Sequence, residues 1–593
     1  MGVYRSDQAQ LTFAAEAAQG GDPEMIEGTP ATGSTTINAN FNAGSRSITV
    51  ASASNFTVGD MIRIGTVDGT AANSYTVHEA RRIELIDGTT FVLDRPTAFY
   101  HASGQEVKEL SALGGAAARN DKGKYITFIP GVYETVDTPD PEMSIEGRRF
   151  LGTQSKRNWS VAYPGQQTLT GSVSGIVLLN GWPLRFPIGS VVTTPQSLGG
   201  NTALLMGEHK KGDIFVRIDN GSGSAVSAIS TQASNGGYIC IDDGSATKSE
   251  VRRLVQAVVN TNYYKLNYPL QFDHDDNVSV DTVDADGGDY FTHTIIEQVD
   301  LDTVSWHVHM TDSTETADYN FDRRYTGGMI GSSTIAAEEG GMVTMSWDSV
   351  NFLNMVHNQQ NQTTVGTNLY TGSNPASNMP RYGLMQTIDS DDVGRPGDNA
   401  GTGYPNTQPY YFAEGLVKFY GQEVARIRSF SLSIANGEEP RYYIGRQGNR
   451  ARGPYEIKEG PREYSLSATL ALPDATVAAS AAHASAAQTG ALELFRQLLL
   501  EGDYGGSTAA TARAGFTASL RFDRGTNDYI IIDIPGSSTA GTPTAGSNQL
   551  NSQGIFINTA PHGLSTDNPF QVDADMIFRS MNIYIRDQEP VYP

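Results

Sequence analysis

The chain has 593 residues, 38% of them apolar and 9% aromatic, which is enough for two to four packed units. Its formal net charge is −24. A protein that neutralises phosphates needs a basic patch, so this charge argues against a nucleic-acid binder. The sequence shows neither a secretory signal nor a run of 18 apolar residues. We therefore expect a chain that is made and folded in the cytoplasm without a membrane partner.

Turn residues and short β-branched runs dominate the sequence. It holds 63 glycines, and runs of Val, Ile, Thr and Tyr recur between them. This pattern predicts a mainly β fold. The single cysteine, Cys240, lies in an apolar run at 238–241, so no disulfide can form within the chain. We expect this thiol to be buried and inert.

An N-terminal arm is predicted over 1–41, followed by a repeat whose first copy spans 42–110. The repeat is seen again over 201–285. In both copies a proline is followed by a histidine after five residues, Pro96 to His101 and Pro269 to His274, and by a valine after eleven. Strand candidates align at 47–50 with 213–216, 59–64 with 236–241, 79–83 with 250–254, and 91–93 with 263–266. Each copy is predicted to be a small β-sandwich or barrel, one module present twice.

Other material lies between and after the two copies, over 111–200 and 286–356. Strand candidates there are 292–299, 304–310 and 341–352, the last with the period-two alternation of a strand that buries one face. Residues 357–410 are rich in Asn, Gln, Gly, Ser and Pro and lack periodicity. Such a segment is either a disordered linker or an arm that orders on a neighbour. Its tyrosines, including Tyr370, Tyr382 and Tyr404, favour the arm.

Strands resume over 411–593. Candidates are 416–420, 423–435, 441–445, 462–472, 516–522, 529–534 and 576–585. Residues 490–500 have helical spacing and end before Gly502, which predicts one short α-helix. The only basic cluster holds Arg446, Arg450 and Arg452. It is either a solvated hairpin loop or a contact to phosphate or to an acidic neighbouring subunit, and the charge of −24 per chain favours the neighbouring subunit.

Catalytic signatures are not found, so we predict neither an enzyme nor a cofactor. His307 and His309 would share one face of a strand, with His293 on a possible neighbouring strand, and three imidazoles could bind a metal. Hydrogen-bonded histidines on a β-surface are the favoured alternative. Acidic runs at 273–277 and 389–392, and three aspartates over 284–289, do not match the calcium-binding loop. No metal site is predicted.

Three stretches of the sequence resemble a known family. They are the opening residues 1–16; residues 131–133 with 139–142 and 180–186; and the run 428–436, 441–445, 453–457 and 463–470. In their order these stretches resemble the tail-tube (major tail) proteins of long-tailed viruses of bacteria and archaea. The resemblance extends over more than half of the chain, but no single motif in it is diagnostic.

The resemblance implies a fold and an assembly. The fold would be a tail-tube β-sandwich or barrel core, divided over 111–200, 286–356 and 411–593, with two small inserted β-modules. Six subunits would form a ring around a lumen, and rings would stack head to tail into the virion tail. Implied partners are further copies of the chain and the tape-measure, terminator and distal tail proteins, with DNA passing through unbound.

Two other classes of function stay open at this stage. One is another structural protein of a virion or of a cell surface, such as a decoration, baseplate or surface-layer component. The other is an enzyme, for example a carbohydrate-active β-protein, which would need a cleft with convergent carboxylates. The state of assembly separates these readings, because only a tube subunit would form regular tubes.

Overall fold

The computed structural model describes the chain in segments. These are residues 9–16, 33–57, 60–65, 79–93, 97, 99–109, 127–128, 133–139, 142–148, 161–201, 203–235, 237–257, 262–283, 289–310, 321–359, 408–419, 426–443, 453–471, 476–478, 488–490, 515–535, 550–551, 554–559, 562–563 and 571–593. The protein is mainly β, as the sequence predicts. The described residues hold one α-helix, α1 (Ser227–Asn235), and none of their helices is long and apolar enough to cross a membrane.

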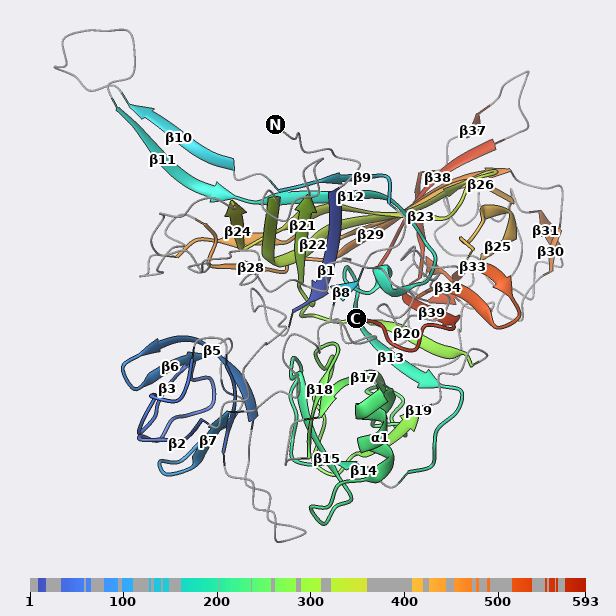
Figure 1. The fold of residues 1–593 in the computed structure, drawn as a ribbon. Coiled ribbons are helices and arrows are strands. Elements are labelled where there is room, and N and C mark those ends of the chain that lie inside the picture. Colours follow the sequence, from blue (N-terminus) through green and yellow to red (C-terminus); the bar gives the residue numbers. More distant parts are fainter. Residues whose placement is uncertain are drawn as a thin grey trace, which may run out of the picture.

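A large, strongly bent antiparallel sheet of thirteen strands forms the upper layer in Figure 1. Its main path is β36 (Phe556–Thr559), β38 (Gln571–Phe578), β29 (Glu463–Ala471), β26 (Arg426–Ala435), β22 (Phe321–Glu338), β21 (Val304–Met310), β1 (Ala9–Ala15) and β8 (Thr127–Phe128). Branches are β23 (Thr344–Asn351), β12 (Thr170–Val177), β9 (Thr135–Asp137), β24 (Asn354–Gln359) and β37 (His562–Gly563).

Strand β22 causes the bend, because it takes part in two sets of pairings. Its first part pairs with β21 and β24, and its second part pairs with β23 and β26. Gly327 and Gly328 lie where the pairing changes. Gly327 has a φ of +73°, and a Cβ atom at Gly328 would lie 2.5 Å from the Phe352 ring. Only glycine fits both conditions.

A second sheet of six strands covers one face of the large sheet. Its order is β13 (Gly189–Pro195), β20 (Phe291–Glu297), β39 (Asn582–Asp587), β34 (Asp528–Ile534), β33 (Ala518–Gly525) and β25 (Gly415–Phe419). One continuous apolar cluster takes side chains from both sheets. For example, the rings of Phe430 and Phe522 stack across the interface, with centroids 5.6 Å apart. The two sheets therefore form a β-sandwich.

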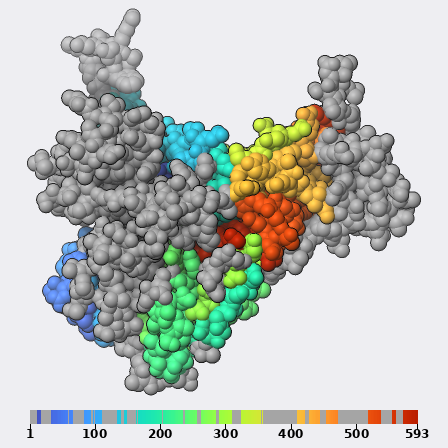
Figure 2. Space-filling model, turned by 45° about the vertical axis from the view of Figure 1, so that its right-hand side comes forward, coloured from blue at the N-terminus to red at the C-terminus, as the bar shows by residue number. Residues whose placement is uncertain are grey.

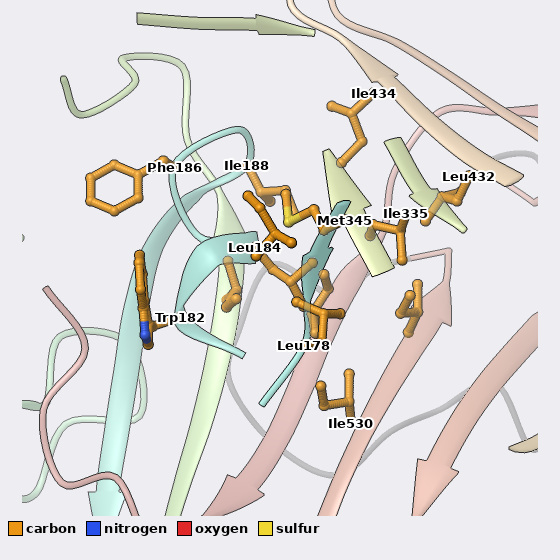
Figure 3. Packing of buried hydrophobic residues seen from close by; sticks show 14 of the residues in the cluster. Leu178, Trp182, Leu184, Phe186, Ile188, Ile335, Met345, Leu432, Ile434 and Ile530 are labelled. Carbon is orange, nitrogen blue, oxygen red and sulfur yellow. The ribbon is translucent and has the colours of Figure 1, made fainter. Parts of the chain in front are cut away.

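The short 3₁₀-helix η3 (Trp182–Leu184) lies in the segment that fills the space between the two sheets. Figure 3 shows Leu178, Trp182, Leu184, Phe186 and Ile188 of this segment among Ile335, Met345, Leu432 and Ile434 of the large sheet and Ile530 of the small one. The indole nitrogen of Trp347 donates a hydrogen bond to the carbonyl of Pro183 at 3.3 Å. Backbone N–H groups of this buried segment find hydrogen-bond acceptors within it, so the segment can lie in the core without contact with solvent.

The two repeat copies fold separately from the sandwich, each around its own apolar cluster. The first module (residues 33–109) holds β2 (Ser34–Thr36), β3 (Ser47–Thr49), β4 (Met61–Ile64), β5 (Glu79–Asp87), β6 (Thr90–Leu93) and β7 (Glu106–Glu109). The second module (residues 203–283) is a closed barrel of β14 (Ala203–Leu205), β15 (Phe215–Asp219), β16 (Tyr238–Ile241), β17 (Glu250–Ala257), β18 (Tyr263–Leu266) and β19 (Ser279–Val283), with α1 packed on it.

The strands of both modules follow one order. In the first module it is β2-β7-β4-β5-β6-β3, and the barrel read from β14 is β14-β19-β16-β17-β18-β15. Isolated β-bridges match as well: Phe41 pairs with His101 in the first module, and His209 pairs with His274 at the equivalent place in the second. One part of the expected alignment is wrong. The backbone hydrogen bond from residue 38 to 49 in the first module is equivalent to the one from 206 to 217 in the second. Residues 47–50 therefore correspond to 215–218, two residues later than the 213–216 expected from the sequence.

Some sequence expectations differ from the structure. Residues 576–585, expected as one strand, belong to β38 and β39 in different sheets, because the chain crosses between the layers at 579–581. Within the range expected as an N-terminal arm, β1 pairs with β21 and β2 pairs with β7. Of the helix expected over 490–500, Gly490 ends strand β31 (Gln488–Gly490) and the other residues lie outside the described part.

Buried Glu16, next to the end of β1, fixes this strand to the sandwich. Its carboxylate accepts hydrogen bonds from the hydroxyls of Thr303 (2.6 Å) and Ser305 and from the backbone N–H of Gly327 (2.7 Å). Nearby, the Phe13 ring packs edge-on against Trp306. A buried carboxylate is tolerated only with such partners, so this contact joins the N-terminal strand to the bend of β22.

We predict that Glu16→Ala lowers the free energy of unfolding by about 3 kcal/mol, because three buried donors lose a charged acceptor. Chemical denaturation followed by tryptophan fluorescence measures the change. The exposed Glu414→Ala is the control and should stay within about 0.5 kcal/mol of the parent. Equal unfolding midpoints for Glu16→Ala and Glu414→Ala would contradict this role.

Candidate functional site

The contact residues predicted from the sequence cannot be placed. Arg446, Arg450, Arg452, Tyr370, Tyr382 and Tyr404 all lie outside the described residues. The described chain on both sides of the basic loop forms a small hairpin of β27 (Glu439–Arg441) and β28 (Glu456–Lys458). Exposed Tyr443 and Tyr455 pack edge-on beside it, with ring centroids 5.5 Å apart. The contact role of the six residues stays a prediction.

Tyr410 fixes the end of the 357–410 segment to the core. Its side chain is fully buried, and its hydroxyl donates a hydrogen bond to Asp528 at 2.7 Å. The Arg524 guanidinium lies 4.0 Å from the centre of its ring. Burial raises the pKa of the Tyr410 hydroxyl well above its usual value, although the Arg524 charge acts in the opposite direction. Tyr410 is therefore a structural anchor in the described fold.

The histidines considered for a metal site do not lie on neighbouring strands. His293 is on β20 of the small sheet, whereas His307 and His309 are on β21 of the large sheet. His293 is fully buried, shares a hydrogen bond with Thr193 at 2.9 Å and stacks on Tyr592. Among the described residues, no three His, Cys, Asp or Glu side chains are grouped to hold a metal ion.

The face of the large sheet turned away from the small sheet is polar, and we call it the open face. Side chains alternate along β26, where Phe430, Leu432 and Ile434 are buried while Ser431 and Ser433 lie on the open face. The other strands follow the same rule. The open face carries Ser332, Thr334, Thr344, Ser346, Ser431, Ser433, Ser465, Ser467, Thr469, Asp573 and Asp575.

Carboxylates on the open face are held by hydroxyls from adjacent strands. Thr469 donates to Asp573 at 2.9 Å, Ser467 donates to Asp575 at 2.8 Å, and Thr334 donates to Asp348 at 2.6 Å. No Lys or Arg occurs in the segments 332–338, 344–351, 429–435, 463–470 and 571–577. Over these segments the open face therefore carries carboxylates and many short hydroxyl side chains but no cation; the exposed Arg428, just outside them, pairs with Glu339 at 3.0 Å.

The open face is hollowed where it crosses β22, β26, β29 and β38. A shallow groove of about 490 Å³ lies there, lined by Glu338, Ser429, Ser431, Thr469, Asp573 and Asp575 among others. Its floor is the backbone of a sheet whose other side is the sandwich core. The groove is wide and open to solvent, and the carboxylates of Asp573 and Asp575 in it accept hydrogen bonds from Thr469 and Ser467.

A two-stranded hairpin extends beyond the large sheet. It consists of β10 (Glu142–Arg148) and β11 (Val161–Thr168), which pair with each other alone among the described strands. Figure 1 shows it projecting from one end of the large sheet. Ile145 and Tyr163 are 64% and 52% exposed. A lone ribbon with apolar side chains in water is only marginally stable on its own.

Comparison with known families decides the class. The profile of the family described as phage tail tube protein matches residues 155–555, about two thirds of the chain. The chain belongs to the phage tail tube protein family. This confirms the resemblance seen in the sequence and makes the chain a structural protein of a virion tail. No curated protein matches the sequence.

Sequence reasoning missed the open face of this tail tube protein, although a signal for it exists. The runs 429–435 and 463–470 alternate Ser or Thr with large apolar residues, and 571–576 alternates Asp with apolar residues. A period-two pattern predicts a strand with one polar face. That the polar faces of five strands join into one surface follows only from their order in the sheet.

Cys240 is buried, as the sequence predicts. Burial raises the pKa of its thiol to about 12, although Ser249 shares a hydrogen bond with it at 3.4 Å. Because thiolate is the reactive form, we predict that a disulfide reagent does not modify the native chain at pH 8 but modifies one thiol per chain after unfolding. Asp275→Cys, at an exposed position, is the positive control. Rapid labelling of the native parent chain would contradict this prediction.

Proposed function

We propose that the protein is the subunit of a tail tube built of stacked rings, and that its open face lines the channel through which viral DNA is ejected. Each ring would be a homo-hexamer assembled in the host cytoplasm. The tube would end on distal tail and terminator proteins and enclose the tape-measure protein during assembly. The observation that carries the proposal is the acidic open face on a member of the tail tube family.

The chemistry of the open face suits a channel for DNA. DNA carries one negative charge per 1.7 Å of its axis, and proteins bind it through Lys and Arg. Carboxylates such as Asp573 and Asp575 repel phosphates, and short hydroxyls do not protrude into the path. Side chains that are already held by hydrogen bonds also lose little conformational entropy as DNA passes them. A lining of this kind lets DNA slide without being held.

Ring closure is supported by the ends of the large sheet. Along the second part of β22 the strand order is β9-β12-β23-β22-β26-β29-β38-β36, so the sheet ends in strands of three and four residues. Exposed edges of a sheet pair readily with other strands. Joining these ends between neighbouring subunits would close the sheets into one barrel around the channel.

The order of layers in the subunit supports a position of the modules on the outside of such a ring. Val191 and Ile295 of the small sheet face the sandwich core, whereas the adjacent Val192 and Ile296 pack on Phe272 of the second module. The small sheet thus lies between the second module and the open face, and Figure 1 shows both modules below the large sheet. If the open face lines the channel, the modules project outward as decorations.

Electron microscopy of the purified chain at low and high salt is the direct test of assembly. Regular tubes or rings with a central hole and peripheral knobs are expected. Dispersed chains under every condition would overturn the tube reading and favour a baseplate or decoration component of the virion.

We predict that the projecting hairpin β10–β11 joins successive rings. The double variant Ile145→Ser and Tyr163→Ser should leave the fold and single rings intact but shorten or abolish tubes, because the apolar contact to the next ring is lost. Electron microscopy measures tube length. Leu85→Ser is the matched control, since Leu85 is 54% exposed on the first module. Tubes of normal length in the hairpin variant would contradict this role.

We predict that Asp573→Lys with Asp575→Lys makes the channel retain DNA. Tubes assembled with short duplex DNA should then hold fragments that resist nuclease, and this retention should fall steeply as salt rises. Parent tubes should retain none. The control is Asp87→Lys with Asp275→Lys, the same charge change on exposed positions of the modules, where bound DNA would be digested. Nuclease-sensitive DNA in both variants would place the open face outside the channel.

A further inference from the structure

The two modules can be compared position by position, because their hydrogen bonds correspond. Gly44 and Gly212 have φ values of +85° and +91°. The backbone N–H of each donates to the carbonyl of a residue four positions before the histidine of the β-bridge, which is His101 in the first module and His274 in the second. Cross-strand partners also correspond, since Ile62 pairs with Arg81 where Ile239 pairs with Arg252. Three equivalent pairs matter here: Arg63 with Cys240, Arg81 with Arg252, and Phe99 with Phe272.

In the second module, these positions lie against the sandwich. Cys240 belongs to the apolar cluster of the sandwich, not to that of its own barrel. Phe272 packs on Val192 and Ile296 of the small sheet. Arg252 is fully buried, where its guanidinium pairs with Glu250 and donates to the carbonyl of Pro269, next to Gln271 and Phe272.

Further hydrogen bonds seal this junction. The side-chain oxygen of Gln271 accepts a hydrogen bond from Val191 N–H at 2.6 Å, and its amide nitrogen donates to the carbonyl of Tyr592 at 3.3 Å. The hydroxyl of Ser249 donates to the carbonyl of Thr193 at 2.8 Å. Figure 2 shows the second module, in green, directly against the end of the chain, in red. The second module is thus fixed to the sandwich.

In the first module, the equivalent positions lie against the second module. The guanidinium of Arg81 pairs with the carboxylate of Asp213 at 3.2 Å, and the two side chains are only 3% and 4% exposed. The Lys210 ammonium lies 5.6 Å from the centre of the Phe99 ring. One face of the module therefore serves both junctions.

We propose that this face, with Arg81 and Phe99 in one copy and Arg252 and Phe272 in the other, is a docking surface that the two copies share. The second module docks on the sandwich, and the first module docks on the second. The two modules are thus attached in series, so the position of the first module relative to the sandwich depends on the second module.

The partner of each docking surface is specific. Asp213, which receives Arg81, corresponds to Ser45 in the first module, by the matching backbone bonds from residue 45 to 42 and from 213 to 210. The first module thus lacks the carboxylate that makes the second an acceptor. A buried arginine needs such a partner, so Arg81 selects the second module over another copy of the first.

Distances between spin labels test the order of docking, with the full chain kept dispersed or diluted with unlabelled chains. Exposed Asp87, Asp275 and Ser465 report on the first module, the second module and the sandwich, and are changed to cysteine in pairs. Because Cys240 lies in the junction to the sandwich, it is changed to alanine in every sample, so that only the introduced thiols are labelled. Narrow distance distributions are expected for all three pairs in the parent protein.

Arg81→Met with Phe99→Ala should broaden the two distributions that involve Asp87→Cys and leave the third narrow. Phe272→Ala should broaden both distributions to Ser465→Cys but leave the one between the modules narrow. Arg148→Met, which removes an exposed ion pair with Glu146, is the control and should change none. A narrow distribution from Asp87→Cys to Ser465→Cys in the Phe272→Ala protein would overturn the proposal.

A charge exchange guards against a general loss of folding. Arg81→Asp alone should broaden the distribution between the modules, and adding Asp213→Arg should narrow it again. Lack of any recovery, with both variants folded by circular dichroism, would show that this pair does not hold the junction.

Discussion

The shared apolar cluster between the two sheets is the constraint on which the structure depends. Every strand that crosses it must place alternate residues inward, as Phe430, Leu432 and Ile434 do in β26. The residues between them are then left on the other side of the large sheet. The small sheet meets a second demand, because its outer residues Val192 and Ile296 must be covered by the second module. The layer order of the whole subunit follows from these two burials.

Buried charged side chains also hold the structure together. An ion pair requires one particular partner, whereas an apolar contact alone would accept many. Although burial alone would raise it, the pKa of Glu250 lies below its usual value, because Arg252 and His274 stabilise the carboxylate. Burial lowers the pKa of Arg185 to about 10, and Asp302 partly offsets this effect. The contacts that depress the pKa of Glu250 stabilise the folded protein at pH values above the ordinary pKa of a glutamate. This stabilisation is lost as the pH falls through the pKa that Glu250 has in the folded protein. The second module, in which Glu250, Arg252 and His274 all lie, therefore loses stability in acid.

Much of the fold could be predicted from local pattern, but its long-range arrangement could not. Strand 304–310 is observed with its expected bounds, and the repeat anchors near His101 and His274 are real. Strand β22 escaped notice because its glycines and small residues resemble a loop, and its role rests on partners far along the chain. The open face was missed for a related reason, since only the strand order joins Ser467 to Asp575. Phe99 and Phe272 each stand two residues before the anchor histidine of their copy, but the sequence does not reveal that they contact different partners.

The reuse of one module face has a consequence for self-association. A repeated unit that binds another copy of itself head to tail carries an inherent risk of open-ended polymers. Here both copies of the binding face are occupied within a single chain, by Asp213 in one case and by the small sheet in the other. The series ends after two steps, because the first module has Ser45 where the second has Asp213 and so lacks the carboxylate that accepts this face.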